Sequence, residues 1–190
     1  MPKEMLILES ARALLIERGF QDVALDDVAK RAGVAKGTLF LYYKGKEELF
    51  AAAFADLVDQ LGRQLDEVLA GPLRGRPLLE KAVGVILSHF DENRDFMAQF
   101  GAGKFPGCGD RSCEKLVRRF SGNLERLASV LRRCAEDGLV ARCDFEVTGA
   151  FLFGMCRSAM MYGMVTGSKK PAYQSRKRIV ELFLEGARKR

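Results

Sequence analysis

The sequence lacks the residues and motifs on which most enzymes depend. Its 190 residues include a single histidine, His89. It has no Gly-x-Ser-x-Gly elbow, no phosphate-binding glycine loop and no paired metal-ligand motif. The sequence therefore argues against an enzyme, and we expect neither a bound metal nor a cofactor.

Long apolar runs are also missing. No run approaches the roughly 20 residues that span a bilayer, because charged residues interrupt every candidate. The first 20 residues contain Glu4, Glu9, Arg12 and Glu17, which break the apolar centre that a signal peptide needs. We therefore expect a cytoplasmic protein with no membrane partner.

Cysteine is sparse, and the five cysteines cannot all form disulfides. Cys108 and Cys113 are separated by four residues, a spacing within the range seen between two zinc thiolates. Cys134, Cys143 or His89 would complete such a site, and oxidation would instead join the pair. Because there is no second closely spaced pair, we predict no metal site. A thiol- or metal-sensing role for Cys108 and Cys113 stays open as an alternative.

Positive charge is in excess only locally. The net charge of +6 lies in the last 23 residues, which hold eight basic and two acidic side chains, whereas residues 1–50 hold eight of each. The segment Val28–Lys46 contains five positive side chains and no negative one. Such a cluster indicates an anionic partner more directly than the overall charge does.

Apolar residues recur with a helical period over most of the chain, and no strand pattern or internal repeat is present. We predict an all-α fold of about nine helices. The expected helices are 4–18, 25–32, 36–43, a long helix from Lys46 to the Gly71-Pro72 break, 77–92, 94–100, 112–137, 145–166 and 173–188.

The two short helices, 25–32 and 36–43, are joined by the turn Gly33-Val34-Ala35. Two helices joined by a short glycine-containing turn are typical of a helix-turn-helix, whose second helix enters the major groove of DNA. Val34 suits a plug between the helices, and Ala29 is small enough to let them approach closely.

The second short helix has more large side chains than one buried face can hold. Leu39 and Tyr43 lie four residues apart and face inward together. Outside we expect Lys36 and Thr38, which suit phosphates or base edges, and Tyr42, whose hydroxyl suits a phosphate. Phe40 or Leu41 would contact a thymine methyl group, and Lys46 would support a phosphate at the next helix start. The alternative is that these aromatic residues form the core of a small bundle.

Residues 4–54 resemble the TetR family of bacterial transcriptional regulators, in register over about 30 positions. The matching segments are Gly19-Phe20, Asp26-Asp27-Val28-Ala29, Arg31-Ala32-Gly33-Val34, Lys36-Gly37-Thr38-Leu39-Phe40, Tyr42-Tyr43-Lys44 and Lys46-Glu47-Glu48-Leu49-Phe50.

The resemblance implies a homodimer that binds a partly palindromic double-stranded operator. It implies phosphate or base contacts at Lys36, Thr38, Tyr42 and Lys46, with variable base reading near Gly37, Phe40 and Leu41. It also implies a three-helix DNA-binding domain, residues 1–47, followed by a helical ligand-binding and dimerisation domain, residues 48–190.

Three helix starts depart from the family pattern. Ala24, Ala35 and Gly45 stand where family members carry capping hydroxyls or amides. Replacing a capping serine by alanine costs about 0.5–2 kcal/mol, and by glycine much less. We therefore expect a somewhat less stable or more weakly binding DNA-binding domain.

The resemblance places the effector pocket among the middle helices and the dimer interface on the last two. Core packing within one chain is the alternative for both sets. Candidate pocket residues are His89, Phe90, Met97, Phe100, Phe105, Phe120, Leu124 and Phe151. Candidate interface residues are Phe151, Met155, Ala159, Ile179 and Phe183.

The sequence thus predicts a repressor that a small apolar molecule releases from its operator. An alternative of another class is a helical dimer that acts through protein partners and has no operator specificity.

Overall fold

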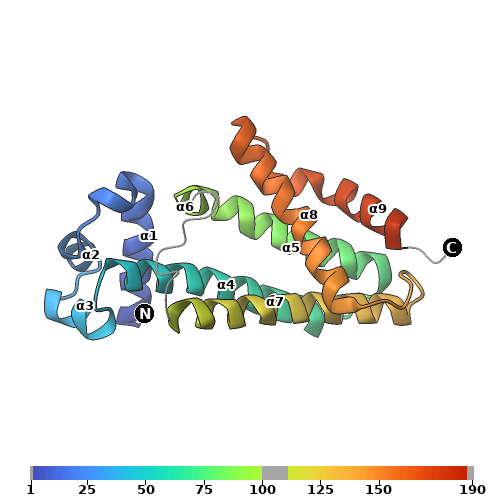
Figure 1. Ribbon diagram of the computed structural model, residues 1–190, viewed down its shortest axis with the longest axis horizontal. Coiled ribbons are helices and arrows are strands. Elements are labelled where there is room, and N and C mark those ends of the chain that lie inside the picture. Colours follow the sequence, from blue (N-terminus) through green and yellow to red (C-terminus); the bar gives the residue numbers. More distant parts are fainter. Residues whose placement is uncertain (1, 100–110, 188–190) are drawn as a thin grey trace. The chain divides into compact units, whose positions relative to one another are not determined.

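The computed structural model describes residues 2–99 and 111–187, which contain nine α-helices, one 3₁₀ helix and no strand (Figure 1). The all-α prediction is confirmed. The elements are α1 (Lys3–Asp22), α2 (Leu25–Arg31), α3 (Lys36–Tyr42), α4 (Lys46–Ala70), α5 (Gly75–Glu92), α6 (Arg94–Ala98), α7 (Arg111–Glu136), α8 (Phe145–Thr166), η1 (Ala172–Ser175) and α9 (Arg176–Ala187).

The described residues fall into two compact units. The first, here called the head, takes its residues from Met1–Leu57 and Asp95–Arg118, and the second, the effector unit, from Val58–Arg94 and Arg119–Arg190. Helices α4 and α7 each contribute residues to both. The functional division predicted at residue 47 stays a prediction.

The head has a core built on one face of α1. Ile7, Ala11, Leu14 and Leu15 of this face are buried, as the sequence predicted. Gly19 interrupts the helix with φ 77° and ψ 164°, a conformation that glycine adopts without strain. Besides Leu8 on α1, the remaining core side chains come from α2, α3, α4 and α6 and from the segments beside them: Val23, Val28, Ala29, Ala32, Leu39, Tyr43, Leu49, Phe50, Ala53, Leu57 and Phe96.

In the effector unit, α5 packs against α8, α9 and η1. Helix α8 begins where Oδ1 of Asp144 accepts the backbone N–H groups of Glu146 and Val147, both at 3.1 Å. It ends at Gly167, which has φ 65°. Gly149 lets α8 approach α7 closely, because a Cβ there would lie 3.3 Å from the backbone nitrogen of Ala128.

Helices α4 and α7 run in the same direction within the effector unit, and polar contacts hold them in register. Arg119 pairs with Asp59 at 2.7 Å, and seven residues further along both helices Arg126 pairs with Asp66 at 2.8 Å. The pKa of Asp66 is lowered by its hydrogen bonds from Arg126. The seven-residue spacing keeps both pairs on one face of the two helices.

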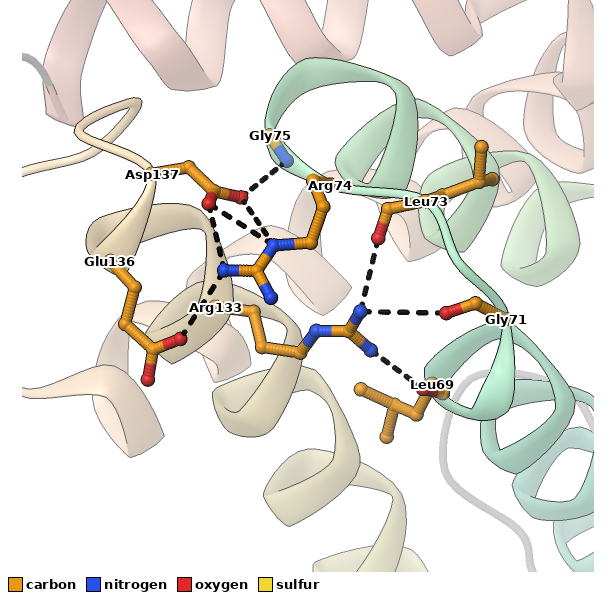
Figure 2. Close-up of polar contacts among 8 residues, drawn as sticks. All are labelled: Leu69, Gly71, Leu73, Arg74, Gly75, Arg133, Glu136 and Asp137. Carbon is orange, nitrogen blue, oxygen red and sulfur yellow. Dashed lines mark hydrogen bonds and ion pairs between the residues drawn. The ribbon is translucent and has the colours of Figure 1, made fainter.

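The same register continues to the ends of these helices (Figure 2). Arg133 donates to the carbonyl oxygens of Leu69 at 2.6 Å and Leu73 at 3.1 Å. Carbonyl oxygens at the end of a helix and in the turn after it have no partner within the helix. Asp137 accepts the backbone N–H of Gly75 at 2.7 Å and holds Arg74 at 2.9 Å. The α4–α5 turn is therefore fixed by the carboxyl end of α7.

Candidate nucleic-acid interface

The α2–turn–α3 segment has the backbone that a helix-turn-helix requires. Gly33 has φ 66°, in the left-handed region. The N–H of Val34 donates to the carbonyl oxygen of Ala29 at 3.0 Å. Ala29 is 3% exposed and Val34 is half-buried against the head core. Val34 therefore packs between the helices as predicted, and Ala29 is buried at the position where a close approach of the helices was expected.

Helix α3 divides into a buried and an exposed face. Leu39 is fully buried and Tyr43 is 5% exposed, whereas Leu41 is 86% exposed. Phe40 and Tyr42 are also exposed, so the alternative in which they form a bundle core is wrong. The exposed face also carries Lys36 and Gly37, with Thr38 half-buried beside them. Its contact with DNA stays a prediction.

Tyr43 anchors α3 to α1. Its hydroxyl donates to Oε1 of Glu4 at 3.2 Å. Burial and the neighbouring Glu4 carboxylate both raise the pKa of Tyr43, so the phenol stays protonated at neutral pH.

The expected DNA-contacting cations have partners within the head. The Nζ of Lys36 lies 2.8 Å from the Asp26 carboxylate. The Nζ of Lys46 donates to the carbonyl oxygen of Gln21 at 2.9 Å and lies 4.7 Å from the centroid of the Phe20 ring. Lys46 therefore also ties the end of α1 to the start of α4, a role that the sequence analysis missed.

Another ion pair neutralises part of the basic cluster, because Arg31 pairs with Glu17 at 2.6 Å. Outside the cluster, Arg18 pairs with Asp27 at 2.7 Å. The segment Val28–Lys46 contains no acidic residue, but the fold brings carboxylates from outside that segment to its cations.

Two of the three unusual helix starts lack a side-chain cap, as the sequence indicated. Neither Ala24 nor Ala35 caps its helix through a side chain. At α4 the Glu48 carboxylate accepts the backbone N–H of Lys44 at 2.7 Å. This hydrogen bond satisfies a donor just before the helix, but not the first-turn N–H groups that a capping side chain at Gly45 would accept.

Part of the predicted effector set lies together. Phe90 and Phe120 each meet Phe153 edge to face, with ring centroids 5.7 and 5.1 Å away. His89 is 2% exposed and Leu124 is half-buried. Phe153, which joins the other two rings, was missed because an apolar residue on an apolar helix gives no distinguishing pattern. These three phenylalanines are called the aromatic cluster below.

The rest of the predicted pocket set is dispersed. Met97 on α6 packs against the head core, and Phe151 is 68% exposed. Phe100 and Phe105 lie outside the described residues. Met97 and Phe151 therefore do not join the aromatic cluster, and the effector site stays a prediction.

The predicted interface residues also divide. On α8, Phe151 is exposed together with Val147, Tyr162 and Val165, while Met155 and Ala159 are half-buried. On α9, Ile179 and Phe183 are 6% and 7% exposed and thus pack within their own chain. The positions of these two residues in the single chain match the alternative considered for the last helices, which is core packing within one chain.

Two of the three free cysteines that the structure describes, Cys134 and Cys156, are buried, and the third, Cys143, is exposed. Burial raises the pKa of Cys134 to about 11 and that of Cys156 to about 12, so both stay thiols at neutral pH. Cys108 and the side chain of Cys113 lie outside the described residues. Elsewhere in residues 2–99 and 111–187, no group of three metal-binding side chains lies together, and no helix is long and apolar enough to cross a membrane.

Comparison with known proteins agrees with this geometry. The chain is 24% identical over 191 residues to the fatty acid metabolism regulator protein of Bacillus subtilis (strain 168), covering 97% of this chain and 95% of that protein. The fatty acid degradation regulator FadR from Bacillus halodurans has a similar structure, with a TM-score of 0.80, 21% identity, and coverage of 100% of this chain and 98% of that one.

The transcriptional regulator FadR from Bacillus subtilis, solved in complex with stearoyl-CoA, also has a TM-score of 0.80, at 20% identity, covering 96% of this chain and 98% of that one. At these identities the structural likenesses show the fold. Residues 7–53, which include α2, the turn and α3, match the family described as bacterial regulatory proteins, tetR family. Over residues 7–53 the chain is thus similar to the TetR family of bacterial transcriptional regulators.

Proposed function

We propose that this protein is a transcriptional repressor that an apolar small molecule releases from its operator. The observation that carries the proposal is the exposed face of α3. A fully buried Leu39 anchors this helix, while Leu41 is 86% exposed. Exposed large apolar side chains on a small rigid helix are typical of a binding surface.

In this proposal Lys36, Thr38, Tyr42 and Lys46 contact phosphates, and Gly37 lets the backbone of α3 approach the DNA. No atom lies within 4 Å of where a Cβ on Gly37 would be, so the space there is open. Phe40 and Leu41 would contact thymine methyl groups, which supply sequence preference. Phosphate contacts supply affinity without preference.

The operator would be read by a homodimer. Val147, Phe151, Tyr162 and Val165 form an exposed apolar stripe on α8, and a second copy would cover this stripe. Two recognition helices in such a dimer enter successive major grooves about 34–36 Å apart. An effector that favours a different spacing therefore weakens both contacts at once.

The effector would bind in the effector unit around the aromatic cluster and His89. The relative solved with stearoyl-CoA makes a long-chain acyl thioester the first compound to test. The aromatic cluster supplies apolar surface for an acyl chain. We propose no catalytic role for any of these residues.

The test uses fluorescence anisotropy with a duplex from the upstream region of the chain's own gene and a scrambled duplex of the same composition. We expect tighter binding to the first duplex, steep salt dependence for both, and release by stearoyl-CoA but not by coenzyme A alone. Leu41→Ala should reduce the preference for the first duplex. The matched control Met5→Ala removes an equally apolar, exposed side chain from α1 and should leave it unchanged. Equal binding to both duplexes by the unaltered protein would refute the repressor.

A further inference from the structure

One carboxylate of the head lies against a cation of the proposed DNA-binding face. Asp26, in the first turn of α2, has its carboxylate 2.8 Å from the Nζ of Lys36, the first residue of α3. Both side chains are 61% exposed. The pair is therefore open to the solvent and to any anion that approaches α3.

Asp26 differs in this respect from its neighbour Asp27. Asp27 occupies the same first turn of α2 but pairs with Arg18 of α1 at 2.7 Å. Arg18 is not among the residues expected to contact DNA. Of the two adjacent carboxylates, only Asp26 engages a side chain that we assign to a phosphate.

We propose that Asp26 competes with DNA phosphate for the Nζ of Lys36 and thereby lowers the affinity of the head for all DNA. This inference rests on the proposed function, because it requires Lys36 to bind a phosphate. Each DNA complex must replace the Asp26–Lys36 pair with a phosphate–Lys36 pair. The Asp26 carboxylate then remains beside the anionic backbone without its counter-charge, and this repulsion opposes binding.

The effect is small and independent of base sequence. An exposed ion pair contributes up to about 1 kcal/mol, so removing its acceptor should raise affinity by about two- to fivefold. Phosphates are present in every duplex, and the gain should therefore be the same for the operator and for scrambled DNA. Asp26 would thus set how much of the protein occupies DNA at a given concentration, without changing its preference among sequences.

The experiment compares the full-length protein with Asp26→Asn, Asp27→Asn, Lys36→Gln and the double variant Asp26→Asn/Lys36→Gln on the two duplexes described above. Asp26→Asn should tighten binding to both duplexes by about two- to fivefold. Lys36→Gln should weaken binding to both and reduce the slope of log affinity against log salt by about one. In the Lys36→Gln background, Asp26→Asn should have no further effect.

Three results would overturn the inference while leaving the repressor intact. In the first, Asp26→Asn leaves the affinity for both duplexes unchanged. In the second, Asp27→Asn tightens binding as much as Asp26→Asn, which would mean that only net charge matters. In the third, the gain persists in the Lys36→Gln background. Asp26→Ser, which also suits a helix start, provides a second variant if the asparagine variant is unstable. Loss of the duplex preference in the unaltered protein would instead refute the proposed function.

Discussion

Gly62 on α4 lies where Asn123 of α7 reaches across to the neighbouring helix. The Nδ2 of Asn123 donates to the carbonyl oxygen of Val58 at 2.8 Å, and Asn123 is 2% exposed. A Cβ on Gly62 would lie 2.8 Å from the Oδ1 of Asn123. A glycine in mid-helix is therefore required here by a side chain of the adjacent helix.

Gly62→Ala should destabilise the protein although alanine is the better helix former. Overpacking at such a contact costs about 1–3 kcal/mol. Replacing glycine by alanine in a helix gains about 1 kcal/mol from helix propensity, so the cost is expected to exceed the gain. Chemical denaturation monitored by circular dichroism measures the change.

The double variant Gly62→Ala/Asn123→Ala shows whether the clash is the cause. Asn123→Ala alone should destabilise by about 0.5–1.5 kcal/mol, because it removes a buried hydrogen bond to the Val58 carbonyl oxygen. In that background, Gly62→Ala should be neutral or stabilising. If its cost is the same in both backgrounds, Asn123 is not what excludes a side chain at position 62.

At the residue scale, the sequence predicted which side chains of α3 are buried and which are exposed, because spacing along one helix determines its faces. It did not predict the Lys36–Asp26 pair. These residues are ten apart on different helices, and their meeting depends on the angle that the Gly33 turn imposes. Single-sequence patterns do not report such an angle.

The α4–α5 turn is an element held by its neighbours more than by its own sequence. Three carbonyl oxygens of this segment, those of Leu69, Gly71 and Leu73, accept hydrogen bonds from Arg133 of α7 (Figure 2). A cation at the carboxyl end of a helix also interacts favourably with the helix dipole.

Arg133→Met should lower the free energy of unfolding by about 1–3 kcal/mol, since it keeps the aliphatic stem but removes charged donors from otherwise unsatisfied carbonyl groups. The control is Arg76→Met, because Arg76 on α5 makes a surface pair with Glu80 at 2.8 Å. That variant should change stability by no more than about 0.5 kcal/mol. Thermal unfolding of both variants provides the comparison, and equal losses would contradict a special role for Arg133.

Element by element, the predicted helices were close to those observed. The short helices predicted at 25–32 and 36–43 are Leu25–Arg31 and Lys36–Tyr42 in the structure, because glycine and apolar periodicity mark both ends. The burial of Ile179 and Phe183 within their own chain matches the alternative considered for the last helices and not the preferred interface. Periodicity shows that a helix has an apolar face, but it does not show whether the same chain or another copy covers it.

The exposed stripe on α8 leads to a prediction for the whole molecule. Phe151→Glu places a charge in the exposed apolar stripe, which also includes Tyr162 at 68% and Val165 at 80% exposure. A buried unpaired charge opposes association. We expect a folded monomer with operator affinity reduced at least about tenfold, because one half-site then binds without the other.

Sedimentation velocity measures the association state of this variant, and circular dichroism confirms its fold. Ile16→Glu serves as the control, because Ile16 is an exposed apolar residue of α1, with 42% exposure. It should leave the association state unchanged. A dimer that persists in Phe151→Glu with unaltered stability would exclude this stripe as the interface.

Among the described residues, the buried core of the head includes Phe96, which is distant in sequence from its other members. Phe96 on α6 is 1% exposed and packs in the core that α1 to α4 form. A chimera that grafted only the residues up to Leu57 onto another regulator would therefore leave a vacancy the size of a phenyl ring in the core of the head. The portable unit is the N-terminal segment together with α6. Swapping DNA-binding specificity between relatives consequently requires two crossover regions in the gene.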